Sequence, residues 1–437
     1  MNLENKPQVK FAEDFIDFTS ESGSTYHAVK LSTDLLEASG FEELNHKKHW
    51  NIELGKKYFV KRTDSTFIAF TIPKEVNEST AFRIVGSHTD SPCFKIKPRP
   101  EQKSNGFLRL NTEIYGAPII STWFDRPLGV AGRVVVKSDD TFNPKSINVK
   151  IDRALMTIPN LAIHQNRTVN EGFNFDKQND VLPIITLLNE TLEKDDFLLK
   201  IISETYNIEL ESILDFDLFL YTYEKGSLLG ANKEFISAPR IDNLASVFTG
   251  LHGLIESDNH SHHINVLAGF DNEEIGSSSK QGANSNYLTN FLERIFCSLA
   301  KSREAFLESI YNSFLISADG AHAVHPAHPE KSDPVVKPRV NEGVVIKCSA
   351  SQKYTSDGYS ISVIKQLLDN KLKLQYFVNN SKFRGGSTIG PLSSTHFDTD
   401  SVDLGVPMLG MHSVTELCGV DDLHDLKELL RLFWIEK

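Results

Sequence analysis

The sequence predicts an α/β fold, a mixed sheet flanked by helices, with a β-rich domain inserted into it. Helix-like and strand-like patterns alternate over 1–91 and again over 235–437, as is typical of a sheet covered by helices. Between them, residues 92–234 carry short runs rich in β-branched and aromatic residues, broken by Gly, Pro, Asn and Asp. We therefore expect one domain built from 1–91 and 235–437, and a second, inserted domain over 92–234.

The N-terminal part predicts two helices followed by three strands. The helices are expected from apolar residues that recur every three or four positions, and the second pattern starts on a Ser/Thr cap and stops at Gly40. The strands are expected from short apolar runs. The predicted helices cover 10–20 and 24–40, and the predicted strands cover 57–60, 65–72 and 81–85.

The rest of the chain continues this alternation. Two helical stretches, 182–192 and 200–212, are expected to interrupt the strands of the inserted segment. Beyond it, apolar periodicity predicts further helices over 244–255, 287–313 and 421–434. Apolar runs predict strands over 264–270 and 314–316, and a last strand that ends at Met411.

Composition excludes several classes of protein. The net charge is −12 and no basic block occurs, so nucleic acid is not an expected partner. The four cysteines lie far apart without a paired CxxC spacing, which fits a reduced, cytosolic set of thiols. The N-terminus lacks the apolar core of a signal peptide, and no run approaches the roughly 20 apolar residues of a membrane span. We therefore expect a cytoplasmic protein without a membrane partner.

Side chains that can bind metals follow the ends of four predicted strands. These strands end at residues 85, 270, 316 and 411, and an aspartate just before a predicted helix adds a fifth position. The carboxyl ends of strands in an open α/β sheet are where ligands bind, so strands sharing one sheet would bring these groups to one rim. The residues are His88 and Asp90, Glu273 and Glu274, Asp319, His412, and Asp242.

This set of side chains suits a metal site. Imidazoles combined with carboxylates, without a thiolate, favour zinc, cobalt or manganese. Two such ions bridged by one carboxylate are typical of hydrolases that activate a water molecule. Of the adjacent Glu273 and Glu274, one could bind metal while the other moves a proton, and their spacing alone leaves the assignment open. Asp90 is well placed to hold the far ring nitrogen of His88.

Each residue also has a simpler explanation. His88 alone could be an ordinary histidine at a strand end, and Asp242 alone could cap the helix that follows it. The coincidence at several independent strand ends favours the metal site.

Six motifs follow one another along the chain: VGSHTDSP, PRIDNLAS, DNEEIGSSSKQGANS, SADGAHAVHP, GGSTIGP and MHSVTE. Their order and spacing resemble those of aspartyl aminopeptidases, a family of dinuclear zinc metallopeptidases. The resemblance runs from about Tyr26 to Glu416. The resemblance implies a zinc-exopeptidase-like sheet with an inserted dimerisation domain.

The resemblance also implies two zinc ions per subunit, with cobalt or manganese possible at one position. Glu273 would be the general base, and Asp90 would orient His88. The implied ligands are His88, Asp242 and Asp319 for one ion, and Asp242, Glu274 and His412 for the other, with Asp242 as the bridge.

The family further implies a homo-oligomer, a tetrahedral dodecamer built from dimers. The segment IPNLAIHQNR is similar to the family segment that sends a histidine, here His164, into the neighbouring subunit's active site. His164 would there help to stabilise the oxyanion of the tetrahedral intermediate.

The resemblance assigns substrate specificity to a smaller group of residues. Lys347 matches a family lysine near the acidic side chain of the substrate, and His322 and His325 resemble family pocket residues. The chain departs from the family where many relatives carry an Asp-Met pair, because it has Lys382, Phe383 and Arg384 there. We hypothesise that these residues, Arg384 among them, reshape the substrate pocket.

The function expected from the sequence is a metal-dependent aminopeptidase that removes N-terminal Asp or Glu from peptides with a free N-terminus. Three alternatives stay open at this point: an aminopeptidase of neutral or broad specificity, a metal-dependent deacylase of N-acyl amino acids, and a non-catalytic oligomeric shell. The last is disfavoured because a scaffold has no reason to retain Glu273 beside its metal ligands.

Overall fold

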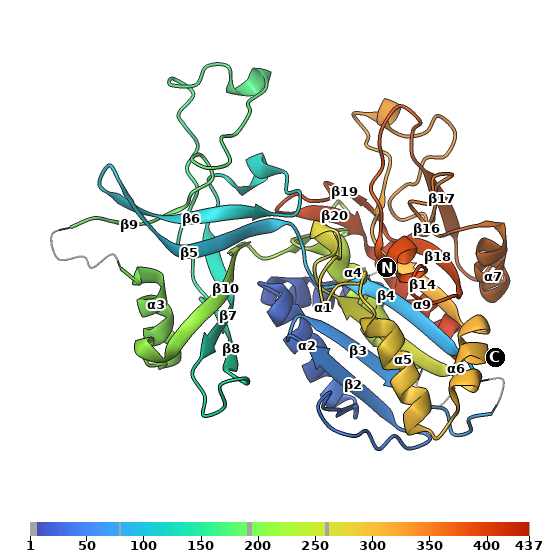
Figure 1. Ribbon diagram of the computed structural model, residues 1–437. Coiled ribbons are helices and arrows are strands. Elements are labelled where there is room, and N and C mark those ends of the chain that lie inside the picture. Colours follow the sequence, from blue (N-terminus) through green and yellow to red (C-terminus); the bar gives the residue numbers. More distant parts are fainter. Residues whose placement is uncertain (1–6, 78–79, 190–194, 258–261, 437) are drawn as a thin grey trace.

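The computed structural model describes residues 7–77, 80–189, 195–257 and 262–436, whose strands form sheets of nine, six and five strands (Figure 1). The nine-stranded and six-stranded sheets lie side by side, and the smaller third sheet lies near their junction (Figure 1). This arrangement confirms the predicted α/β class, with mixed sheets flanked by helices.

The nine-stranded sheet carries most of the predicted strand ends. Its three central strands run parallel to one another in the order β13, β4, β14, and almost every residue in them is buried. Because parallel strands end on the same side, their carboxyl ends meet at one edge of the sheet. In spatial order the strands are β1 (Glu42–Glu43), β2 (Lys57–Arg62), β3 (Thr66–Thr71), β13 (Ile264–Phe270), β4 (Phe82–His88), β14 (Phe314–Ala318), β18 (Asp400–Gly405), β16 (Val344–Cys348) and β17 (Leu374–Val378).

Helices cover both faces of this sheet because its buried strands present apolar side chains on each side. Val85 packs in the cluster on one face, while its neighbour Ile84 packs in the cluster on the other. The first face is covered by α1 (Pro7–Glu21), α2 (Thr25–Ala38), α4 (Ile241–Glu256), α7 (Gly358–Leu368) and α9 (Val420–Ile435). The second is covered by α5 (Tyr287–Ser298), α6 (Arg303–Tyr311) and the short α8 (Ile389–Ser393).

The six-stranded sheet is entirely antiparallel and has a hydrophobic core of its own. Helix α3 (Phe197–Tyr206) contributes Leu198 and Ile202 to that core. The division of the chain into a catalytic domain and an insert over 92–234 stays a prediction. In spatial order the strands are β8 (Lys145–Lys150), β7 (Leu128–Val136), β10 (Ile213–Thr222), β5 (Cys93–Ser104), β6 (Phe107–Tyr115) and β9 (Ile184–Leu187).

The five-stranded sheet joins segments from distant parts of the sequence. It consists of β11 (Ser227–Leu229), β12 (Phe235–Ala238), β20 (Glu416–Gly419), β19 (Pro407–Leu409) and β15 (Ala321–His322). The strand predicted to end at Met411 corresponds to β19 in this sheet. The four strands do not all share one sheet, because β19 pairs with β15 and β20 and not with the nine-stranded sheet.

Two predicted helices were wrong. The described part of 182–192 contains β9, whose run of β-branched residues pairs with β6. The helix predicted over 287–313 is divided into α5 and α6, because Ala300 takes a left-handed φ of 56° between them. The other predicted helices and strands lie close to their expected positions, and α3 ends at Tyr206, earlier than 212.

Within the described residues, no helix combines the length and apolar character needed to cross a membrane. A cytoplasmic location stays a prediction.

Candidate metal centre

Three neighbouring strands of the large sheet deliver carboxylates and an imidazole to one edge. His88 is the last residue of β4, and Asp319 follows directly after β14. Glu273 and Glu274 lie in a 3-10 turn, η5 (Glu273–Ile275), that begins three residues beyond the end of β13. The convergence expected from the strand ends is therefore present for these side chains.

Two further side chains reach the same place from other elements. Asp242 lies in the first turn of α4, and His412 follows β19 with a left-handed φ of 69°. The side chain of Asp242 does not cap α4. The simpler explanation of this aspartate as a helix cap thus does not hold, since its carboxylate faces the two histidines instead.

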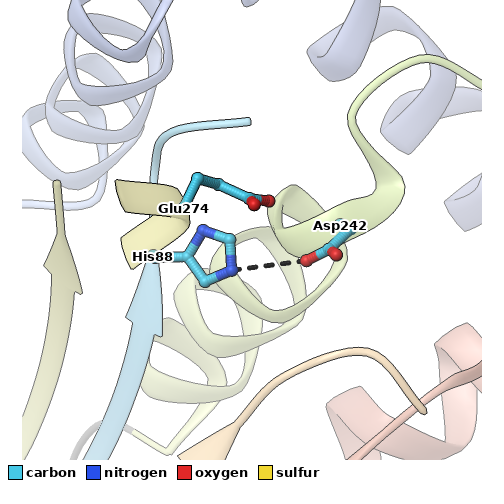
Figure 2. Close-up of side chains that lie close together, drawn as sticks. All are labelled: His88, Asp242 and Glu274. Carbon is cyan, nitrogen blue, oxygen red and sulfur yellow. Dashed lines mark ion pairs between the residues drawn. The ribbon is translucent and has the colours of Figure 1, made fainter. Parts of the chain in front are cut away.

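The side chains point toward one another across short distances. The Nε2 atom of His88 lies 3.3 Å from Oδ1 of Asp242 and 3.6 Å from Oδ1 of Asp319. On the other side, Nε2 of His412 lies 3.4 Å from Oδ2 of Asp242 and 3.4 Å from Oε2 of Glu274. Figure 2 shows the carboxylate of Asp242 facing the ring of His88, and the carboxylate of Glu274 extending into the space beside them. Asp242 thus turns one oxygen to each histidine.

Two observations indicate that these side chains could bind metal ions. The Asp242 Oδ1 and Glu274 Oε1 atoms are buried without a hydrogen-bond partner, and a buried carboxylate oxygen needs a donor or a cation. Two donors that are each about 2.1 Å from a tetrahedral zinc ion lie roughly 3.4 Å apart, which matches the spacing of the nitrogen and oxygen atoms here.

The histidines present the nitrogen that a metal needs. His88 donates from Nδ1 to the backbone carbonyl of Asp90 at 3.0 Å, and His412 donates from Nδ1 to the carbonyl of Ala117 at 3.1 Å. Each bond fixes the proton on Nδ1 and leaves the lone pair of Nε2 directed at the carboxylates.

Crowding of buried carboxylates shifts their pKa values. Burial raises the pKa of the Glu273 carboxyl to about 8, and the carboxylates of Asp319 and Asp90 add to this effect. Burial and the charge of Asp242 likewise raise the pKa of Glu274 well above its usual range. Such a cluster of like charges is favourable only beside positive charge.

Asp90 has a role different from the one that its spacing suggests. Its carboxylate lies 3.5 Å from Nδ1 of His88, farther than its own backbone carbonyl. The carboxylate instead accepts the backbone N–H groups of Glu273 and Glu274, both at 3.1 Å. Asp90 therefore orients His88 mainly through its backbone, and holds the turn of the two glutamates with its side chain.

Glu416 holds two of the candidate ligands and was not singled out from the sequence. Its buried carboxylate accepts the backbone N–H of Asp242 at 2.9 Å and that of His412 at 2.7 Å. Burial, with the nearby charge of Asp242, raises the pKa of Glu416 to about 8. The only sequence signal was its position at the end of the MHSVTE motif.

A cavity of about 300 Å³ opens onto the candidate ligands. Lys347 lines it and is almost fully buried, with Nζ 3.3 Å from Oδ2 of Asp319 and donating to the carbonyl of Gly320 at 3.1 Å. His322 lines the same cavity. Its other lining residues are His88, Asp242, Glu273, Glu274, Asp319, Gly320, Ala321, Tyr354, Phe377, Gly386, Ser387, Thr388, Met411 and His412.

The remaining predicted residues lie outside this cavity. His325 is exposed and packs against the ring of His328. Arg384 is exposed on the segment before α8, where neighbouring Phe383 lies under the ammonium of Lys331. His164 is exposed in the long connection between β8 and β9, on the six-stranded sheet. The roles of these three residues stay predictions.

The sequence matches a family profile over nearly its full length. The profile is described as Aminopeptidase I zinc metalloprotease (M18) and covers residues 18–434. A probable M18 family aminopeptidase 2 from Clostridium novyi is 50% identical over 419 residues, which are 95% of this chain and 96% of that protein.

Solved structures agree with this match. A chain in the cryo-EM structure of the Ape4 and Nbr1 complex has a TM-score of 0.94 and 37% identity, covering 100% of this chain and 88% of that one. The S. cerevisiae mApe1 dodecamer has a TM-score of 0.83 and 26% identity, covering 97% of this chain and 96% of that one.

Proposed function

This chain belongs to the M18 family of zinc metallo-aminopeptidases, and from that premise we propose that it removes Asp or Glu from the N-terminus of peptides. Membership of the family makes the chain a metal-dependent aminopeptidase. The preference for acidic residues and the use of two metal ions are the parts that we propose. The observation that supports the use of two ions is the carboxylate of Asp242, whose two oxygens face two histidines on opposite sides.

The donors divide into two sets that share one aspartate. The first would hold one zinc ion through His88, Asp242 and Asp319, and the second would hold another through Asp242, Glu274 and His412. When bound, such ions lower the pKa of a water molecule and polarise the scissile carbonyl.

Glu273 is the general base in this proposal. It lines the cavity beside Glu274 but is held in place by its backbone, since its N–H donates to Asp90. Its carboxylate is thus free to take the proton of the attacking water and to pass it to the leaving amine.

Lys347 supports an acidic substrate preference. Its ammonium is buried in the cavity wall, where a substrate carboxylate would be attracted strongly because water is excluded. Asp319 already faces this ammonium, so the lysine would serve both the aspartate and the substrate.

We also propose that the protein works as a homo-oligomer. The similarity to the mApe1 dodecamer supports a homo-oligomer. We propose that it is a tetrahedral dodecamer built from dimers, and that the dimers pair through the six-stranded sheet. His164 is exposed on that sheet's long connection, a position from which it could enter a neighbouring subunit's cavity.

The test is the release of N-terminal Asp, Glu and Leu from short peptides by purified protein. We expect chelation to abolish release, zinc to restore it, and Asp and Glu to be released faster than Leu. Cobalt and manganese are added back in parallel, and N-acetylated peptides serve as the control.

Each other result favours a different function. Faster release of Leu would overturn the acidic preference but keep the aminopeptidase. Hydrolysis that requires the acetyl group would favour a deacylase, and a metal-loaded oligomer without any activity would favour a shell.

A further inference from the structure

A short segment of the six-stranded sheet wraps around the candidate metal centre. It comprises residues 115–119, between the end of β6 and a 3-10 turn, η2 (Ile120–Trp123), and we call it the positioning segment. None of the candidate metal ligands lies in this segment. Its contacts with the metal centre are nevertheless numerous, and they come from three consecutive residues and Ile119.

Tyr115 holds the turn that carries both glutamates. Its hydroxyl donates to Oδ2 of Asp90 at 2.8 Å and accepts from Nδ2 of Asn272 at 2.9 Å. The same Oδ2 atom accepts the backbone N–H of Glu274 at 3.1 Å. The ring packs edge-on against Phe219 in the six-stranded sheet. The Tyr115 hydroxyl thus holds the carboxylate of Asp90 and the side-chain amide of Asn272. Both contact or adjoin the turn that carries Glu273 and Glu274.

Gly116 lies directly against a candidate ligand. A Cβ atom at this position would lie 3.1 Å from Cβ of Glu274 and 3.5 Å from its Oε2. The residue also has a φ of 71°, a conformation that glycine adopts without strain. Glycine therefore lets the backbone of the segment close over Glu274.

The next residues fix His412. The carbonyl of Ala117 accepts from Nδ1 of His412 at 3.1 Å, and the N–H of Ile119 donates to the carbonyl of His412 at 2.9 Å. Pro118 follows Ala117 and restricts it to an extended conformation, which limits the directions its carbonyl can take. Both the ring and the backbone of His412 are therefore held by the segment.

We propose that the positioning segment sets the geometry of the second metal position within its own subunit. It does so by fixing the glutamate turn on one side and His412 on the other. The six-stranded sheet then contributes to metal affinity and rate in each subunit, and not only to contacts between subunits. This inference rests on the proposed function for the identity of the metal ligands.

Two substitutions test it in the full-length protein. Tyr115→Phe removes the hydroxyl and keeps the ring, and Gly116→Ala places a methyl group against Glu274. Groups that orient metal ligands typically change affinity or activity by 10- to 100-fold when altered. We expect zinc affinity to fall about 10-fold for Tyr115→Phe and further for Gly116→Ala, with kcat falling alongside and KM changing less than about threefold.

Matched controls separate positioning from general loss of stability. Tyr221→Phe removes a buried hydroxyl of the same sheet that donates to the carbonyl of Ile151, and Tyr221 does not line the cavity at the candidate ligands. Gly106→Ala introduces the same kind of strain, at a φ of 87°, with open space around the new methyl group. Zinc affinity is measured by competition with a chromophoric chelator, kcat and KM on an N-terminal Asp peptide, and melting temperature on the metal-free proteins.

The possible outcomes test the role of the positioning segment separately from the proposed aminopeptidase function. That role is overturned if Tyr115→Phe and Gly116→Ala match their controls in zinc affinity and kcat, or if all four variants lose affinity in proportion to melting temperature. A wild-type protein that binds zinc but cleaves no peptide would contradict the proposed function, while the chelator competition would still decide the inference. A wild-type protein that binds no zinc would overturn both.

Discussion

Glu273 differs from the residues around it in the hydrogen bonds that position it. The carboxylates of Asp90 and Glu416 accept backbone N–H groups, and the rings of His88 and His412 donate to backbone carbonyls. Glu273 is anchored only through its own N–H among these contacts, which leaves its carboxylate available for chemistry.

The substitution Glu273→Gln should therefore separate catalysis from metal binding. We expect kcat to fall by roughly 10²- to 10⁴-fold, the usual contribution of general acid–base catalysis. Zinc content and melting temperature should stay unchanged, because glutamine has nearly the same volume and the backbone contact to Asp90 remains. Activity is measured on an N-terminal Asp peptide and metal content by elemental analysis.

An exposed glutamate in α6 provides the control, since Glu304→Gln should leave kcat unchanged. Retention of more than about a tenth of wild-type kcat by Glu273→Gln would contradict its role as the base.

At the residue scale, the sequence led to the side chains that face the cavity but not to those that hold them. His88 and Asp319 could be found because each follows an apolar strand. Tyr115 and Glu416 could not, because each also bonds a distant partner, Asn272 at 157 residues and Asp242 at 174 residues along the chain. Such contacts have no local pattern.

At the scale of elements, α2 lies where the sequence predicted it, but the residue expected to cap it has a different partner. The Ser/Thr start predicted a capped helix, and α2 does begin after Ser24. The hydroxyl of Ser24, however, lies 2.9 Å from Nδ1 of His27 and does not cap the backbone. Burial lowers the pKa of His27 to about 4, and the positive charges of Lys150 and Arg240 add to this effect.

The lowered pKa predicts acid sensitivity. The unfolded chain takes up a proton at His27 near pH 6.5 and the folded chain only near pH 4, so stability falls as pH drops between these values. His27→Gln removes this linkage. Relative to wild type, its unfolding free energy should rise by up to about 3 kcal/mol as pH falls from 8 to 4.

Urea unfolding at several pH values measures the effect, and His49→Gln, at an exposed position, is the control. Parallel pH curves for wild type and His27→Gln would contradict the prediction.

The two wrongly predicted helices have different causes. The stretch 182–192 carries a short apolar run that fits helix or strand equally well, whereas the helix predicted over 287–313 is interrupted where Ala300 takes a left-handed φ. Pairing with β6 decided the first case, since β9 completes the edge of the six-stranded sheet.

At the scale of the whole molecule, the long connection between β8 and β9 extends away from the nine-stranded sheet (Figure 1). It carries His164, which does not line the cavity of its own subunit as the described residues form it. A role for this histidine in catalysis therefore requires a second copy of the chain.

Mixed oligomers test this requirement. Subunits with His164→Ala lack the histidine, and subunits with Glu273→Gln lack the base, so each oligomer alone should be nearly inactive. Random co-assembly into dimers should restore about a quarter of wild-type activity, because half of the dimers are mixed and each has one complete site. Co-expression with two affinity tags and activity assays provide the measurement.

Full activity of His164→Ala alone would contradict a contribution from the neighbouring subunit. Mixed oligomers that stay as inactive as their parents would contradict it as well.

By itself, the sequence determined the α/β class, the family resemblance and the side chains at the strand ends. These follow from local periodicity and from motifs, which a linear pattern carries directly. Only the tertiary structure decided that β13, β4 and β14 are parallel neighbours, that His412 arrives from a different sheet, and that the positioning segment closes over Glu274. Those features depend on which distant segments pack together, and the free energy of that packing is shared among residues that no short stretch of sequence contains.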